Sequence, residues 1–131
     1  MCDKVDTKEL KKIALLHDAT EAYMRDLPKP LKYLLPDYQK MEDTLWKVIS
    51  TRFNVPFELP DVIKEIDMRL LMTERECQLV HHIRWDLDVL NIERYPEDIV
   101  AWEEEKSIRA RYTSRLYALQ DESIWRTYGL L

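Results

Sequence analysis

Glycine is almost absent from this 131-residue sequence, which has only Gly129, whereas average usage is about 7% of a chain. Glycine supplies the positive-φ positions of hairpin turns and of loops that cradle phosphate groups. The chain before Gly129 therefore excludes a P-loop, a GxGxxG dinucleotide turn and a GxSxG nucleophile elbow. The scarcity also argues against a sheet-rich fold and favours helices joined by proline-containing turns.

Several other features are missing from the sequence. It has no run of about 18 apolar residues, so we expect no membrane span. The first ten residues lack the apolar core of a signal peptide, and the two cysteines, Cys2 and Cys77, do not indicate a disulfide framework. We therefore expect free thiols and a cytoplasmic protein. The 20 basic residues are outnumbered by 25 acidic ones, and the net charge of -5 argues against binding a nucleic acid polymer.

The hydrophobic pattern predicts an all-α fold in one domain spanning residues 1–131. Asp6 and Glu9 have capping-box spacing, so the first helix should begin near Asp6. Three prolines restrict residues 27–36 to an ordered turn or a short helical piece. The expected helices cover residues 6–24, 37–53, 61 onward, 80–90 and 96–119. Asp37 should cap the second helix, and Pro96 should begin the last. The third helix should continue through Cys77 or end just before His81.

Two of these helices show clear apolar stripes that should face the core. The stripe of the 37–53 helix consists of Tyr38, Met41, Leu45, Val48, Ile49 and Phe53, and that of the last helix of Ile108, Tyr112, Leu116 and Leu119.

Ionisable residues interrupt two other apolar stripes. His17 and Glu21 lie one helical turn apart on the line of Ile13, with Asp18 beside them, and Asp67 follows Ile63 on a later helix. A buried carboxylate without a partner is costly, so a divalent cation is one economical explanation. The alternatives are a hydrogen-bonded core histidine and a salt bridge from Asp67 to an arginine.

The string LLHDATEAYMRDLPKPLK (Leu15–Lys32), followed by KEIDMRLLMTE (Lys64–Glu74), closely resembles the HD-domain phosphohydrolases. The resemblance is strongest to short forms from phage and bacterial genomes and to the related bacterial 5′-deoxynucleotidases, and it covers about residues 10–78. It implies an HD-domain-like helical bundle. It also implies a metal-dependent phosphohydrolase that cleaves a phosphate ester or anhydride of a small molecule, such as a nucleotide or deoxynucleotide.

Position by position, the resemblance implies that His17, Asp18 and Asp67 are metal ligands. The ion would be divalent: manganese, cobalt, nickel, magnesium, iron or zinc. Glu21 matches the family glutamate that positions or deprotonates the attacking water, and Asp26 matches an aspartate thought to assist the leaving group or the water. The lysines of the proline turn are candidate phosphate contacts or plain surface residues: Lys29 and Lys32.

One departure from the family pattern H…HD…D stands out. No histidine precedes His17, and the other two, His81 and His82, lie downstream. Three explanations remain open: an upstream segment of the natural protein, a three-ligand site completed by water, or a catalytically impaired protein. In the last case the fold would serve as a nucleotide-binding or protein-interaction module. A missing first helix would also uncover an apolar groove, including part of the Leu10–Met24 stripe, which predicts a homodimer.

Overall fold

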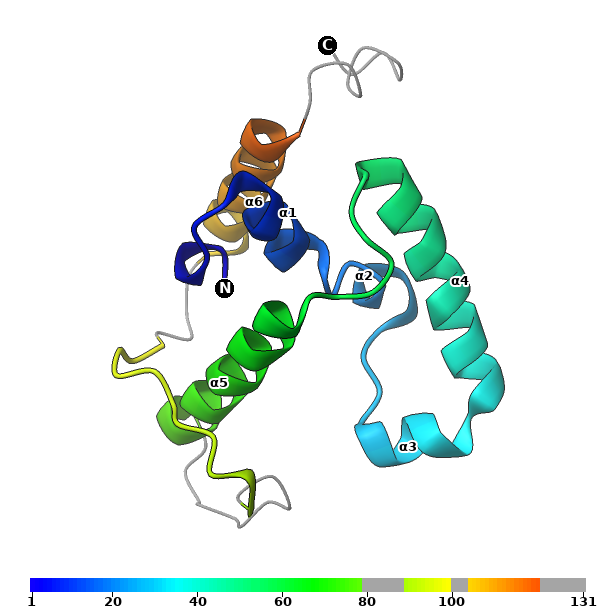
Figure 1. Ribbon diagram of the computed structural model, residues 1–131, viewed down its shortest axis with the longest axis horizontal. Helices are drawn as coiled ribbons and strands as arrows, with labels where there is room; N and C mark the ends of the chain where they lie inside the picture. Colours follow the sequence, from blue (N-terminus) through cyan, green and yellow to red (C-terminus); the bar gives the residue numbers. More distant parts are fainter. Residues whose placement is uncertain (79–88, 100–103, 121–131) are drawn as a thin grey trace.

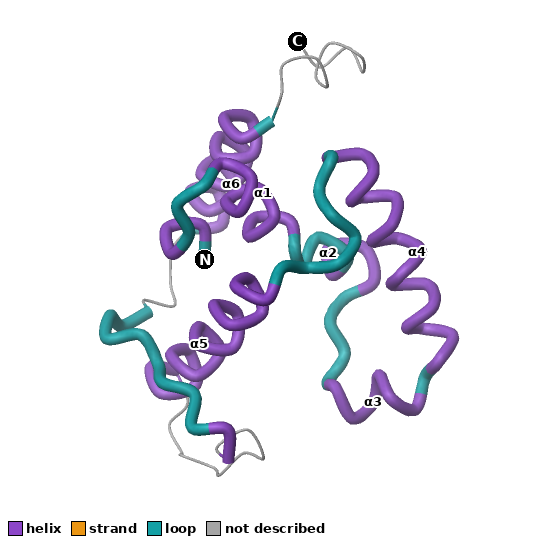
Figure 2. The backbone as a smooth tube through the Cα atoms, in the orientation of Figure 1, coloured by secondary structure: helices purple, strands orange, loops and turns teal. Residues whose placement is uncertain are grey.

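The computed structural model describes residues 1–78, 89–99 and 104–120, and within these ranges it contains helices and no strand. Figures 1 and 2 show their arrangement, with α4 standing apart from the group formed by α1, α5 and α6. The prediction of an all-α fold is confirmed. No described helix combines the length and the apolar character needed to cross a membrane. The elements are η1 (Cys2–Lys4), α1 (Lys8–Leu16), α2 (Glu21–Met24), α3 (Lys29–Leu34), α4 (Pro36–Phe53), α5 (Asp61–Gln78) and α6 (Glu105–Leu119).

The single helix predicted from Asp6 to Met24 is divided into α1 and α2 by a turn over residues 17–20. The N-terminal cap is Thr7 and not Asp6, because the Thr7 hydroxyl accepts the backbone N–H of Leu10 at 3.2 Å. The turn places His17 directly after the end of α1. The break thus puts His17 and Asp18 in a turn, and both residues line a cavity.

The proline-rich segment forms the short helix α3, as predicted. Pro36 then occupies the first turn of α4, where its missing N–H costs nothing, and Asp37 is not the cap. The helix ends at Asn54, whose left-handed φ of 50° lets its N–H return to the last turn. The predicted break at residues 54–60 is thus confirmed.

Helix α5 begins at Asp61 as predicted and continues through Cys77 to Gln78. Most of the helix predicted over residues 80–90 lies outside the described residues. The last helix begins at Glu105 and not at Pro96, so that prediction is wrong. The reason is that residues around Pro96 pack across α5 instead: the Tyr95 ring lies between the Lys4 ammonium and the Arg69 guanidinium, each 4.3 Å from its centroid.

The core lies where η1, α1, α4 and α5 meet. Helix α1 packs against η1, α5 and α6, which explains why it is the most buried helix. The buried apolar side chains are those of Cys2, Val5, Ile13, Ala14, Leu16, Trp46, Ile49, Val55, Ile63, Ile66 and Met72.

Two predicted stripes face the core only in part. On α4, Trp46 and Ile49 are buried, whereas Met41 and Val48 are 61% and 62% exposed. On α6 no side chain is fully buried, and Ile108 and Tyr112 are exposed. The physical reason is that α4 touches the core along one narrow edge and α6 packs only on one side, so most of each stripe has no described neighbour. The uncovered α4 face borders an apolar hollow of about 500 Å³ lined by Met24, Lys40, Met41, Thr44, Leu45 and Val48.

Candidate metal centre

The imidazole of His17 is oriented by the helix that it terminates. Its Nδ1 lies 3.1 Å from the carbonyl oxygen of Ala14 in the last turn of α1. A carbonyl oxygen can only accept, so Nδ1 carries a proton and Nε2 is the nitrogen left for a metal or a second proton. A backbone partner on the second ring nitrogen is also the usual arrangement behind a metal-binding histidine.

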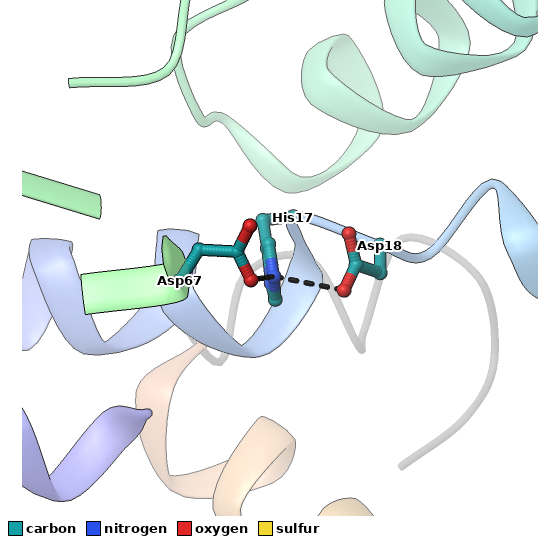
Figure 3. Close-up of side chains that lie close together, drawn as sticks. All are labelled: His17, Asp18 and Asp67. Atoms are coloured by element: carbon teal, nitrogen blue, oxygen red, sulfur yellow. Dashed lines mark ion pairs between the residues drawn. The ribbon is translucent and has the colours of Figure 1, made fainter. Parts of the chain in front are cut away.

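Two carboxylates from different parts of the chain lie against Nε2. An Asp18 oxygen is 2.8 Å away and an Asp67 oxygen 3.5 Å away, and Figure 3 shows the imidazole between the two. One ligand atom from each of the three residues lies within 4.8 Å of the others. The structure therefore brings together the three predicted ligands, one at the end of α1, one in the following turn and one on α5.

The burial of this group is uneven. The His17 side chain is 14% exposed, but those of Asp18 and Asp67 are 57% and 51% exposed, so the expectation that Asp67 lies in the interior is wrong. Ile63, one turn before Asp67, is fully buried, whereas Asp67 lines a cavity. The carboxylates thus avoid most of the desolvation penalty and stay accessible.

The donor set fits a divalent cation. Nε2 is buried, and the Asp18 and Asp67 carboxylates lie 2.8 and 3.5 Å from it. Burial alone would lower the pKa of His17, but Asp18 and Asp67 outweigh it and raise this pKa to about 9. A cation would satisfy Nε2 and both carboxylates together. One imidazole and two carboxylates suit manganese, iron, cobalt, nickel or zinc, and three protein ligands leave positions open for other molecules.

Glu21 stands beside the cluster at the start of α2 and lines the same cavities as His17 and Asp18. Burial, followed by the charges of Asp18 and Asp26, raises the pKa of Glu21. A carboxylate with a raised pKa takes a proton more readily at neutral pH. The place of this predicted residue in both cavities makes it a candidate for proton transfer.

Asp26 and Lys32 form part of one ion-pair network. The Lys32 ammonium lies 3.0 Å from Glu42 on α4 and 3.3 Å from Asp26. Burial alone would lower the pKa of Lys32, but these two carboxylates raise it, so Lys32 is a cation at neutral pH. Lys32 also lines two cavities next to His17, so its charge can reach a ligand there. Lys29 lines only one cavity and is exposed, which distinguishes the two predicted lysines.

The loop that carries Asp26 contains a backbone outlier. Arg25 has φ of 63° and ψ of 163°, a backbone region that residues other than glycine avoid. The Tyr38 hydroxyl donates to the Arg25 carbonyl and holds this conformation. The strained residue therefore sets where Asp26 stands relative to the cluster.

Two cavities meet at the cluster. Both are lined by His17, Asp18, Glu21 and Lys32. The larger, about 580 Å³, continues past Asp67 along α5 and is lined beyond the shared residues by Met1, Asp26, Leu27, Lys29, Met68, Leu70, Leu71 and Glu74. The smaller, about 440 Å³, which we call the aromatic cavity, continues between α4 and the loop before α5 and is lined by Thr20, Glu42, Asp43, Trp46, Phe57, Glu58, Leu59 and Lys64.

Sequence reasoning missed the α4 side of the site. Glu42 has no motif around it, Trp46 is predicted to be a packing residue, and Phe57 lies in the predicted 54–60 break without any marked role. A signal was present for Glu42, because an acidic residue between Met41 and Leu45 borders the apolar stripe. Nothing in the local pattern indicates Phe57, since the 54–60 loop acquires its position only from the fold.

Comparisons with known proteins agree with the motif. Residues 1–85 match the family described as "YfbR-like: 5'-deoxynucleotidase YfbR-like". A protein of Escherichia coli strain K12, named "Uncharacterized protein YfdR", is 43% identical over 75 residues, which are 57% of this chain and 42% of that protein. The chain thus spans less than half the length of this curated relative. No solved structure matches the chain.

Proposed function

The chain belongs to the YfbR-like 5′-deoxynucleotidase family, and on this premise we propose that it is a divalent-metal-dependent phosphohydrolase acting on a nucleotide or deoxynucleotide. The observation that carries the proposal is the convergence of His17, Asp18 and Asp67 within 4.8 Å at the junction of two open cavities. Two carboxylates gathered around one buried imidazole nitrogen form a donor set that a single cation can share.

In this proposal His17, Asp18 and Asp67 hold the ion. When bound, a divalent cation lowers the pKa of water and stabilises charge on a phosphoryl oxygen. The chain's own residues orient the ligands and position the substrate. The Ala14 carbonyl orients the imidazole, and the open side of the half-exposed carboxylates leaves room for a phosphate group.

Glu21 would take the proton of the attacking water, as its raised pKa and its place in both cavities suggest. Lys32, held by Glu42 and Asp26, would place its positive charge against the phosphate. Asp26 would act beside it on the water or the leaving group. Positioning and charge stabilisation of this kind account for most catalysis of phosphoryl transfer.

A second candidate is a catalytically impaired protein that keeps the fold for nucleotide or protein binding. It is favoured by the small size of the ligand set, since three residues of the described part of the chain form it. The two candidates predict different results in the same experiment.

The test is metal analysis of the purified chain together with a phosphate-release screen across nucleotides and deoxynucleotides, with added Mn²⁺, Co²⁺, Ni²⁺ or Mg²⁺. A hydrolase releases phosphate from a subset of them, and Asp18→Ala abolishes both turnover and metal retention. The matched control is Asp37→Ala, which removes an exposed carboxylate from the first turn of α4, outside both cavities. Metal retention without turnover on any compound would refute the hydrolase and favour the binding module.

A further inference from the structure

Phe57 is one of the residues that line the aromatic cavity. Phe57 is 50% exposed, and the cavity is also lined by His17, Asp18 and Glu21. The loop that carries it crosses from α4 to α5 beside α2, as Figure 1 shows. Exposed apolar side chains are common in this structure, but Phe57 combines its exposure with a place in the same cavity as the polar cluster, which is where a ligand could cover it.

The ring is held in place through its own backbone. The buried Trp46 indole N–H donates to the Phe57 carbonyl oxygen at 2.6 Å. At the start of the loop, Asn54 closes α4 in the left-handed conformation, and buried Val55 donates its N–H to Ser50 at 3.0 Å. The loop is therefore fixed before any ligand arrives, which lowers the entropic cost of binding.

The two cavities carry similar charges and differ in their aromatic lining. Beyond the shared residues the cavity presents Glu42, Asp43 and Glu58, and Lys64 is paired with Asp61 at 3.0 Å. Carboxylates repel a phosphate chain but accept hydrogen bonds from amino and hydroxyl groups. The larger cavity also presents three carboxylates and one lysine of its own, but its other walls are aliphatic and it has no aromatic residue.

We propose that the aromatic cavity binds the base of the nucleotide, with the ring of Phe57 as its stacking platform and Phe57 as a determinant of substrate specificity. The phosphate end then lies at the junction of the cavities beside Lys32 and the metal cluster, and the nearby carboxylates accept from the base or the sugar. A volume of about 440 Å³ suits a nucleoside-sized group. This inference rests on the proposed function for the identity of the ligand.

The experiment compares two ligands that differ only in the base: deoxyadenosine monophosphate and 2-deoxyribose 5-phosphate. Binding is measured by calorimetry with Mn²⁺ in the Glu21→Gln background, and turnover in the wild-type background. Phe57→Leu should weaken binding and raise KM for the nucleotide about 5- to 100-fold, the range of one base–aromatic stack. Both values for the base-free sugar phosphate should stay within about two-fold, and Phe57→Trp should restore the nucleotide values.

Equal losses for both ligands would show that Phe57 only supports the loop, and no loss for either would show that the base lies elsewhere. A base-dependent loss from Leu71→Ala in the larger cavity, without one from Phe57→Leu, would likewise overturn the inference. Glu105→Gln, which breaks an exposed ion pair on α6, is the control for the Glu21→Gln background, because it too replaces a carboxylate by an amide. If wild-type protein binds the nucleotide through Phe57 but releases no phosphate, the proposed hydrolysis fails and the base site stands.

Discussion

The affinity of the metal centre should depend on pH far into the alkaline range. Nε2 of His17 must lose its proton before it can bind a cation, and the neighbouring Asp18 and Asp67 raise the pKa of this imidazole to about 9 in the metal-free protein, although burial alone would lower it. Below that pH, proton and metal compete for one nitrogen. Each unit of falling pH should therefore weaken binding about tenfold.

The magnitude follows from the fraction of His17 that is unprotonated. Between pH 6.5 and 8.5 this fraction rises about 80-fold for a pKa of about 9, but only about two-fold for the ordinary pKa of 6.5. The difference is large enough to separate a coupled cluster from an isolated histidine. Metal uptake should also release about one proton per ion below pH 8.

Calorimetric titration with Mn²⁺, in buffers that differ in ionisation enthalpy, measures both quantities. His17→Gln should bind weakly at every pH and lose the steep dependence, whereas Asp37→Asn should follow the wild-type curve. An affinity that levels off above pH 6.5 would refute the coupling between the imidazole and the two carboxylates.

Four further predictions concern catalysis, stability and assembly. Glu21→Gln should keep the metal and reduce turnover by about 10²–10⁴, measured by phosphate release; an unchanged rate would place proton transfer elsewhere. Because the folded pKa of His17 is raised, its stabilising effect is full below pH 6.5 and is lost as pH rises through about 9. Urea unfolding of the metal-free protein should show about 1–2 kcal/mol of loss over that range, after allowance for half-exposed partners, and none in His17→Gln. Tyr95→Leu removes two cation contacts and should cost about 1–2 kcal/mol, while Tyr95→Phe should cost little. The exposed α4 face predicts a homodimer by light scattering that Val48→Asp dissociates; a monomeric wild-type mass would contradict it.

Local sequence patterns predicted the helices where their signals were strong. Asp61 opens α5, and the break at Asn54 follows from a run of residues that cannot continue a helix. A wrong helix boundary arose where a local signal competed with contacts made in the fold. Pro96 has the chemistry of a helix start, but the contacts of Tyr95 with Lys4 and Arg69 hold the adjacent segment across α5.

The candidate site was predictable where its residues share a motif. His17, Asp18 and Glu21 stand within one short string, and Asp67 was identified by its place on an apolar stripe. The break in the predicted 6–24 helix at residue 17 was not predictable. The four-residue spacing of His17 and Glu21 fits a continuous helix and a turn equally well. Phe57 could not be found at all from sequence, since its role depends on a loop brought from the far end of α4.

The acceptor that orients His17 is a main-chain atom. Whatever side chain residue 14 acquires in the course of evolution, its carbonyl remains, so no point mutation there can delete this hydrogen bond without also disturbing α1. The pairing of Lys32 with Glu42 has no such protection, because a single codon change in either residue removes it. Genetic drift should thus remove the Lys32–Glu42 ion pair, and with it the proposed phosphate contact, long before it changes the orientation of the imidazole.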